Sequence, residues 1–156
     1  MVKTWEEKNA RKAERANAID ALHLVKLHYT ASNGTDLTVK LTPWSTFGFG
    51  KRKMPANFVR FNANIPTEEV CTTPDKFGTE GVVYASRPLV LGGKKVENFG
   101  FRFEKCKVVE VLAGEGKEML EALIRMDENA CYLGEAALVE YHSPISLSQV
   151  VYYTTL

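Results

Sequence analysis

The sequence predicts an α+β fold with a mainly antiparallel sheet, built from hairpins and covered by one or two amphipathic helices. Predicted strands outnumber predicted helices, and they do not alternate with helices as the strands of a parallel sheet do. With 45% apolar and 25% charged residues, a chain of 156 residues can bury one sizeable core. We therefore expect residues 1–156 to form a single domain with residues 1–22 as a leading helix.

The first predicted element is a helix over residues 4–21, which consist mostly of good helix formers. A hairpin should follow, with one strand over residues 22–29 and a second over residues 37–41. Its turn at residues 32–35 contains Asn-Gly, which accepts positive φ. The least polar face of the helix is made of small side chains and should dock weakly; it comprises Ala10, Ala13, Ala16 and Ala21.

The composition of residues 43–55, with two glycines and the basic run at 51–53, predicts a loop. Apolar residues over 58–65 then predict a strand that leads directly into Glu68 and Glu69. The two glutamates would lie at a strand end, where functional sites are common.

Residues 81–91 form a mostly apolar segment, which predicts a buried strand that ends at a pair of glycines. Strict alternation of phenylalanines over residues 99–103 predicts a second hairpin, which returns through residues 109–111. The clearest amphipathic helix, over residues 116–129, should cover the sheet. A strand over residues 134–139 follows, and residues 150–156 should form a last strand or short helix.

The charge balance excludes several classes of function. Lysine and arginine number 20 and aspartate and glutamate 19, so no overall field attracts nucleic acid or an anionic membrane. The basic run at 51–53 could contact nucleic acid, but a solvated loop fits the neutral chain better. No stretch is long enough to span a membrane, and the amino end does not have the pattern of a signal or transit peptide.

Three cysteines without CxxC spacing argue against a disulfide scaffold or a thiolate zinc site, and favour the reducing cytoplasm. We expect Cys71 to be a small buried side chain rather than a nucleophile. Lone histidines on strands are more often structural than metal-ligating, and we interpret His23 and His28, on the first predicted strand, in this way. His142 likewise has no second ligand nearby at a known spacing.

The carboxylates of Glu68, Glu69 and Glu135 are the candidate functional groups. Carboxylates on rigid backbone commonly bind a cation, although adjacent glutamates are more often part of a solvated face. The ordered blocks of sequence around them resemble the family of metal-dependent aminopeptidases typified by aminopeptidases T and S. These blocks span nearly the whole chain: residues 34–39, 63–70, 73–74, 80–86, 132–139 and 143–145.

The resemblance implies a cytoplasmic exopeptidase, usually a homodimer, that releases amino-terminal residues from peptides with two divalent metal ions. It assigns Glu69 and Glu135 as metal ligands. The family's other ligands are two histidines, a tyrosine and an aspartate from sequence beyond residue 156, and the family has a further domain before the matched region. We therefore expect residues 1–156 to be the middle part of such an enzyme, and the isolated chain to lack several ligands.

The resemblance also implies a mechanism. Zinc or cobalt is the first choice of metal, with magnesium or manganese as alternatives. Two ions about 3.5–4 Å apart can share the attacking hydroxide, while the substrate α-amine ligates one of them. Glu68 is the candidate general base by analogy with other dinuclear aminopeptidases; its alternative role is that of a solvated neighbour or an anchor behind the ligands. A non-catalytic remnant or interaction module of the same fold is the alternative function.

Overall fold

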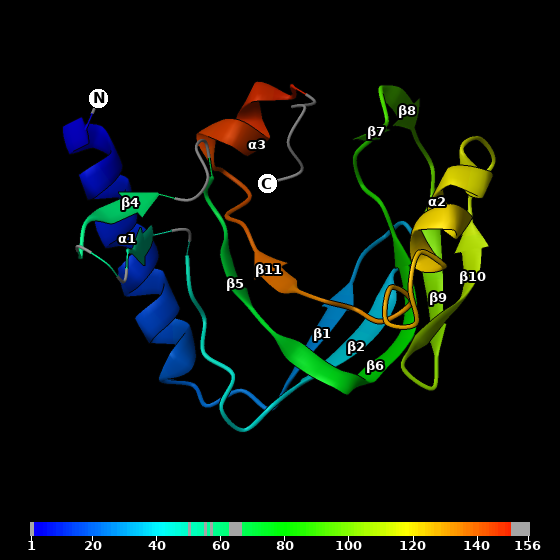
Figure 1. The fold of residues 1–156 in the computed structure, drawn as a ribbon, viewed down its shortest axis with the longest axis horizontal. Helices are drawn as coiled ribbons and strands as arrows, with labels where there is room; N and C mark the ends of the chain where they lie inside the picture. Colours follow the sequence, from blue (N-terminus) through cyan, green and yellow to red (C-terminus); the bar gives the residue numbers. More distant parts are fainter. Residues whose placement is uncertain (1, 50, 55, 57, 63–66, 151–156) are drawn as a thin grey trace.

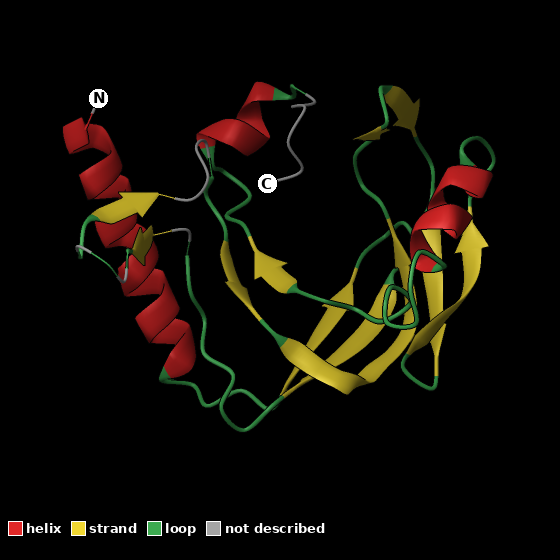
Figure 2. Cartoon of the chain, in the orientation of Figure 1, coloured by secondary structure: helices red, strands yellow, loops and turns green. Residues whose placement is uncertain are grey.

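The computed structural model describes residues 2–49, 51–54, 56, 58–62 and 67–150. It confirms the α+β class (Figures 1 and 2). The elements, in chain order, are α1 (Val2–Asp20), β1 (Lys26–Thr30), β2 (Asp36–Leu41), β3 (Lys51–Lys53), β4 (Arg60–Asn62), β5 (Val70–Thr72), β6 (Pro74–Tyr84), β7 (Leu89–Leu91), β8 (Lys94–Val96), β9 (Gly100–Glu104), β10 (Lys107–Leu112), α2 (Lys117–Ile124), β11 (Ala136–Leu138) and α3 (Pro144–Ser148).

The largest sheet has five strands in the order β1-β2-β6-β9-β10, and every neighbouring pair is antiparallel. Two-stranded antiparallel sheets join β11 to β5, β3 to β4 and β7 to β8. In Figure 1 the β5–β11 pair lies between α1 and the five-stranded sheet. Among the described residues, no helix has the length and apolar character needed to cross a membrane.

Both predicted hairpins are confirmed. β1 pairs with β2 across a turn in which Gly34 has φ 94°, and the Asn33 side-chain oxygen accepts a hydrogen bond from the Thr35 amide at 3.1 Å. β9 pairs with β10 across Lys105 and Cys106, which both have positive φ. Two consecutive left-handed residues match the twist of an antiparallel pair, so this turn suits a tight hairpin.

The prediction of one strand over residues 81–91 is wrong. β6 begins at Pro74 and ends at Tyr84, and Leu89–Leu91 belongs to a separate hairpin with β8. Pro88 lacks a backbone N–H and restricts the residue before it, so a continuous strand is interrupted there. Gly92 and Gly93, with φ 55° and 78°, form the turn of the β7–β8 hairpin.

Two other boundaries also differ from the sequence-based expectation. The first strand begins at Lys26, not residue 22, because the turn after α1 extends through His23, which has φ 48°. The helix expected over 116–129 is confined to Lys117–Ile124. Beyond it, the Asp127 carboxylate accepts hydrogen bonds from the amides of Asn129 and Ala130 at 2.7 and 2.9 Å. Such side-chain bonds compete with helical backbone bonds, which accounts for the shorter helix.

The segment before Glu68 and Glu69 also differs from the sequence-based prediction. The basic run is strand β3, which pairs with β4, and not a loop. Of the strand predicted over 58–65, β4 covers Arg60–Asn62, and residues 63–65 lie outside the described residues. Glu68 and Glu69 directly precede β5, so they lie at the start of a strand and not at the end of the predicted one. Of the element expected over 150–156, only residue 150 is described; it follows α3.

Helix α1 buries a different face from the predicted alanine stripe. Ala16 is buried, but Ala10 and Ala21 are exposed, and the buried line continues through the polar residues Asn9 and Lys12. Asn9 Nδ2 donates to Asn62 Oδ1 at 2.8 Å, and Lys12 Nζ donates to the Thr67 carbonyl at 3.3 Å. These hydrogen bonds pair the buried Asn9 amide nitrogen and the Lys12 ammonium, and they link α1 to β4 and to Thr67, which precedes β5.

Candidate metal centre

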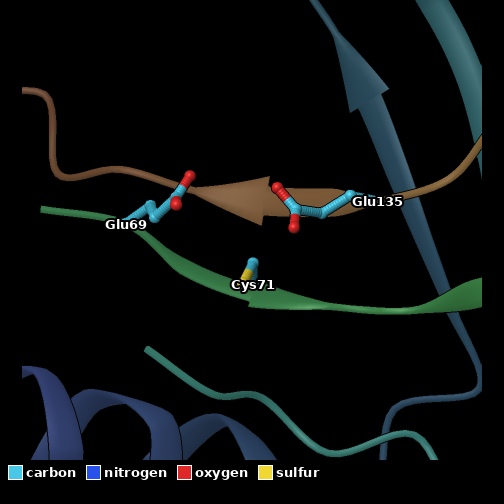
Figure 3. A group of neighbouring side chains, drawn as sticks. All are labelled: Glu69, Cys71 and Glu135. Carbon is cyan, nitrogen blue, oxygen red and sulfur yellow. The ribbon is translucent and has the colours of Figure 1, made fainter. Parts of the chain in front are cut away.

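Three potential metal ligands lie together on the β5–β11 pair (Figure 3). Glu69 directly precedes β5, Cys71 lies within it, and Glu135 directly precedes β11. One carboxylate oxygen of each glutamate and the Cys71 sulfur all lie within 4.8 Å of one another. The structure thus brings together the two predicted ligands, which are far apart in the sequence, and adds a thiol.

Strand pairing explains this convergence. Cys71 faces Ala137 in the antiparallel ladder, with Val70 opposite Leu138 and Thr72 opposite Ala136. Because side chains alternate along a strand, Glu69 and Cys71 share one face of β5, and Glu135 and Ala137 share the same face of the pair. The other face is buried at Val70, Thr72 and Ala136, which anchors the pair to the core.

Ala137 leaves space above the centre of this face. In the β5–β11 ladder its small methyl group lies directly opposite Cys71, so longer side chains from diagonal positions can reach across it. Figure 3 shows the carboxyl groups of Glu69 and Glu135 directed toward each other along the strands, with Cys71 between them on β5. We name these three residues the acid–thiol group.

The acid–thiol group concentrates negative charge. Burial raises the pKa of Glu69, the neighbouring Glu135 carboxylate raises it further, and Lys12 opposes both effects. Burial in turn lowers the pKa of Lys12, although Glu68 and Glu69 favour its charged form. Among the ion pairs of the described residues, none includes Glu69 or Glu135. A cation bound between the two carboxylates would therefore relieve their repulsion.

Glu68 lies outside the acid–thiol group. Its carboxylate forms an ion pair with Lys8 of α1, and its side chain is only 11% exposed. It lines a cavity of about 340 Å³ between α1 and the segment after β11, together with Lys12, Arg15 and Glu140. The ion pair holds Glu68 beside Glu69 in the chain but directs the Glu68 side chain toward α1.

The expectation that Cys71 is buried is wrong. Cys71 is half-buried. It lies on the same side of β5 as Glu69, because the two residues are two positions apart in an extended segment. The sequence offered one signal for this position, namely the two-residue spacing between Glu69 and Cys71 in an extended segment. That spacing becomes informative only when the strand is known to begin at Val70.

None of the three histidines belongs to the acid–thiol group. His23 lies in the turn after α1, and His28 Nε2 contacts Asp36 Oδ1 at 2.7 Å on the exposed side of the first hairpin. His142 follows β11, and its ring packs edge-on against Tyr141 with centroids 5.0 Å apart.

The donor set fits a divalent metal ion. Catalytic zinc sites combine three protein ligands with an open position, and carboxylate oxygen and thiolate sulfur both ligate zinc. Here two oxygens and one sulfur converge on a half-exposed face. Glu69 and Glu135 would contribute negative charge, and the open side of the face would admit further ligands or substrate.

Comparisons with known proteins agree with the resemblance seen in the sequence. Over residues 1–156 the chain matches the family model described as thermophilic metalloprotease (M29). It is 41% identical to aminopeptidase AmpS of Bacillus subtilis over 155 residues and 40% identical to aminopeptidase T of Thermus thermophilus over 155 residues. The structure of wild-type AmpT from Thermus thermophilus superimposes with a TM-score of 0.88 at 40% identity.

These matches cover 99% of this chain in each case. The chain spans 37% of AmpS and 38% of aminopeptidase T, and it covers 38% of the AmpT structure. The matched region includes Glu69, Cys71 and Glu135. The chain belongs to the thermophilic metalloprotease (M29) family.

Proposed function

We propose that this protein is a metal-dependent aminopeptidase that releases amino-terminal residues from peptides. The observation that carries the proposal is the convergence of Glu69 and Glu135 on one face of the β5–β11 pair. Family membership supports it, as do the names of the relatives, which are aminopeptidases. Two divalent ions, zinc or cobalt in the first place, are the proposed cofactors.

The proposed roles follow from position. Glu69 and Glu135 each present a carboxylate from the edge of the strand pair, and both would ligate metal. When bound, the divalent ions would supply Lewis-acid polarisation of the peptide carbonyl and activation of water. We propose that further ligands come from sequence outside residues 1–156, because the relatives are more than twice as long as the matched region. A homodimer and a cytoplasmic location are part of the same proposal.

Glu68 remains the candidate general base, with an anchoring role through Lys8 as its alternative. The two roles predict different kinetics for Glu68→Gln. Loss of a general base lowers kcat by about 10²–10⁴-fold and leaves metal affinity intact. Loss of an anchor that orients Glu69 weakens metal binding instead, by about 10–100-fold. Metal titration and steady-state kinetics on the same preparation distinguish these outcomes.

Calorimetric titration with zinc and with cobalt tests the proposal directly. Glu69→Ala and Glu135→Ala should each weaken metal binding strongly and abolish hydrolysis of an aminoacyl chromogenic amide. Glu140→Ala is the matched control, because Glu140 follows β11 but pairs with Arg15 outside the acid–thiol group. Unchanged metal affinity in both Glu69 and Glu135 variants would refute the assignment. Tight metal binding without turnover would favour the non-catalytic module.

A further inference from the structure

Cys71 is the member of the acid–thiol group that has no role in the proposed function so far. Its sulfur lies within 4.8 Å of a carboxylate oxygen from each glutamate. The other two thiols have different surroundings. Cys106 is buried near Glu80, and the Cys131 sulfur lies 3.9 Å from the backbone oxygen of Glu128. Among the described residues, Cys71 is thus the thiol that lies beside two carboxylates suited to metal.

We propose that the Cys71 thiolate is a third protein donor to the metal held by Glu69 and Glu135, and that it makes the site selective for zinc-like cations. This inference rests on the proposed function, because it takes the two glutamates as ligands. It adds a sulfur donor to the two carboxylates and predicts which divalent metals the site prefers.

The distances are compatible with a shared ion. Bond lengths of about 2.3 Å for zinc–sulfur and about 2.0–2.2 Å for zinc–oxygen place donors roughly 3.5 Å apart in a tetrahedral site. The three atoms already lie within 4.8 Å of one another. Rotation about the side-chain bonds of Glu69 and Glu135 can close the remaining gap, because both residues lie just outside the paired strand segments.

The strand pair supports Cys71 as the fixed donor. Cys71 lies at the centre of β5 with a residue of the ladder on each side, and its neighbours Val70 and Thr72 are buried. Ala137 opposite it occupies little volume, so an ion above Cys71 meets no large side chain from β11. A rigid sulfur flanked by two adjustable carboxylates suits the capture of a metal ion.

The sulfur decides the metal preference. Thiolate is a soft ligand that favours zinc and cobalt, whereas magnesium and manganese prefer sites made only of oxygen. Coordination replaces the S–H bond with a sulfur–metal bond and releases the proton to solvent, so no oxidant or reductant is required. Two carboxylates alone would not discriminate in this way.

Cobalt absorption spectroscopy on the purified protein tests the inference. A cobalt–thiolate bond gives an intense near-ultraviolet charge-transfer band, whereas the visible d–d bands report bound cobalt whatever its ligands. Wild type should show both. Cys71→Ser should lose the ultraviolet band and keep the visible bands, while the matched control Cys131→Ser should keep both. A wild-type spectrum with visible bands alone, or an ultraviolet band that persists in Cys71→Ser, would overturn the proposal.

A competition titration supplies a second readout. Cys71→Ser should weaken zinc binding by about tenfold or more, since even partners that only orient a ligand contribute that much. Magnesium affinity should stay unchanged, and equal losses for both metals would contradict the proposed selectivity.

The same titrations separate the two proposals. Cobalt binding that depends on Glu69 and Glu135 but shows no ultraviolet band refutes only the role of Cys71. Cobalt binding that is insensitive to both glutamates refutes the proposed metal ligands themselves. Absence of cobalt binding refutes the role of Cys71, because a site made of two carboxylates and a thiolate should hold cobalt without further ligands.

Discussion

In the five-stranded sheet, β2 and β9 direct apolar side chains into the core, where Leu37, Val39 and Phe103 are buried. One face of the β5–β11 pair instead carries two carboxylates and a thiol. Leu37, Val39 and Phe103 form one buried cluster with Ala136, which is the point where the two sheets meet. Both sheets are antiparallel ladders with alternating side chains. They differ in the side chains that they carry: the large sheet contributes apolar side chains to the core, whereas one face of the β5–β11 pair carries the acid–thiol group.

The difference shows which region stabilises the folded state and which region opposes folding. Burial of apolar side chains stabilises the large sheet. On the strand pair, burial and the Glu135 carboxylate both raise the pKa of Glu69, so the ionised group opposes folding there. We expect substitutions in the large sheet to lower the free energy of unfolding. Substitutions of Glu69 or Glu135 should raise it when metal is withheld.

The largest effect should come from Gly81, at the centre of the five-stranded sheet. It has φ 111°, and a Cβ at this position would lie 2.1 Å from the Asp36 carbonyl oxygen. Gly81→Ala combines backbone strain with a clash against the neighbouring strand, so we expect a loss of about 4 kcal/mol or more. Urea denaturation measures this loss. Gly48→Ala is the control, because nothing lies within 4 Å of a Cβ there and the residue has no positive φ. Equal stability of the two variants would contradict the prediction.

Leu120 on α2 should give the next largest effect. It is 1% exposed and packs with Val96 and Val111. Leu120→Ala should lower the free energy of unfolding by about 2–5 kcal/mol and leave cobalt affinity unchanged below the unfolding transition. Leu123→Ala, at a position 39% exposed on the same helix, should cost much less. A change in cobalt affinity for Leu120→Ala would show that the two regions are energetically coupled.

A smaller effect of opposite sign should follow Glu135→Gln. In the presence of chelator, loss of one of two facing carboxylates should raise the free energy of unfolding by about 0.5 kcal/mol, the order found for exposed charge pairs. On addition of zinc, wild type should gain stability and the variant should not. Glu97→Gln is the control, because Glu97 pairs with Lys95 instead of facing a carboxylate. Destabilisation of Glu135→Gln without metal would argue that the two carboxylates do not repel each other.

The smallest effect should be the pH dependence from Tyr29 in β1. Burial raises the pKa of Tyr29 above its ordinary value of 10.0. The unfolded chain therefore releases this proton at lower pH than the folded chain, and stability falls as pH rises from about 10 through the raised pKa. Tyr29→Phe should flatten this part of the decline in denaturation curves recorded across pH. Tyr141→Phe, at a position 78% exposed, should keep the wild-type slope.

Local chemistry made the two main hairpins predictable. The Asn-Gly turn before β2 and the alternating phenylalanines of β9 depend on residues a few positions apart, so the sequence pattern suffices. The same holds for the position of α2, although the turn at Asp127 ended it early. The family blocks identified Glu69 and Glu135, and the structure places these two residues together.

The role of β5 was not predictable, because its partner β11 lies far along the chain. No local signal states that Cys71 faces Ala137, and a shift of one residue in register would turn Cys71 to the buried side. The buried face of α1 was missed for a related reason. Asn9 and Lys12 are buried on this face, where Asn62 and the Thr67 carbonyl, both distant in sequence, accept their hydrogen bonds.

The sequence by itself therefore determined the fold class, the two main hairpins and the family. It also predicted Glu69 and Glu135 as site residues. Only the tertiary structure showed that the Cys71 thiol lies beside the carboxylates of Glu69 and Glu135, and that Glu68 is directed toward α1. Turn chemistry and side-chain alternation act over a few residues, so they can be recognised in the sequence. The register between distant strands depends on the packing of the whole chain, because each pairing gains stability only when the opposite face is buried.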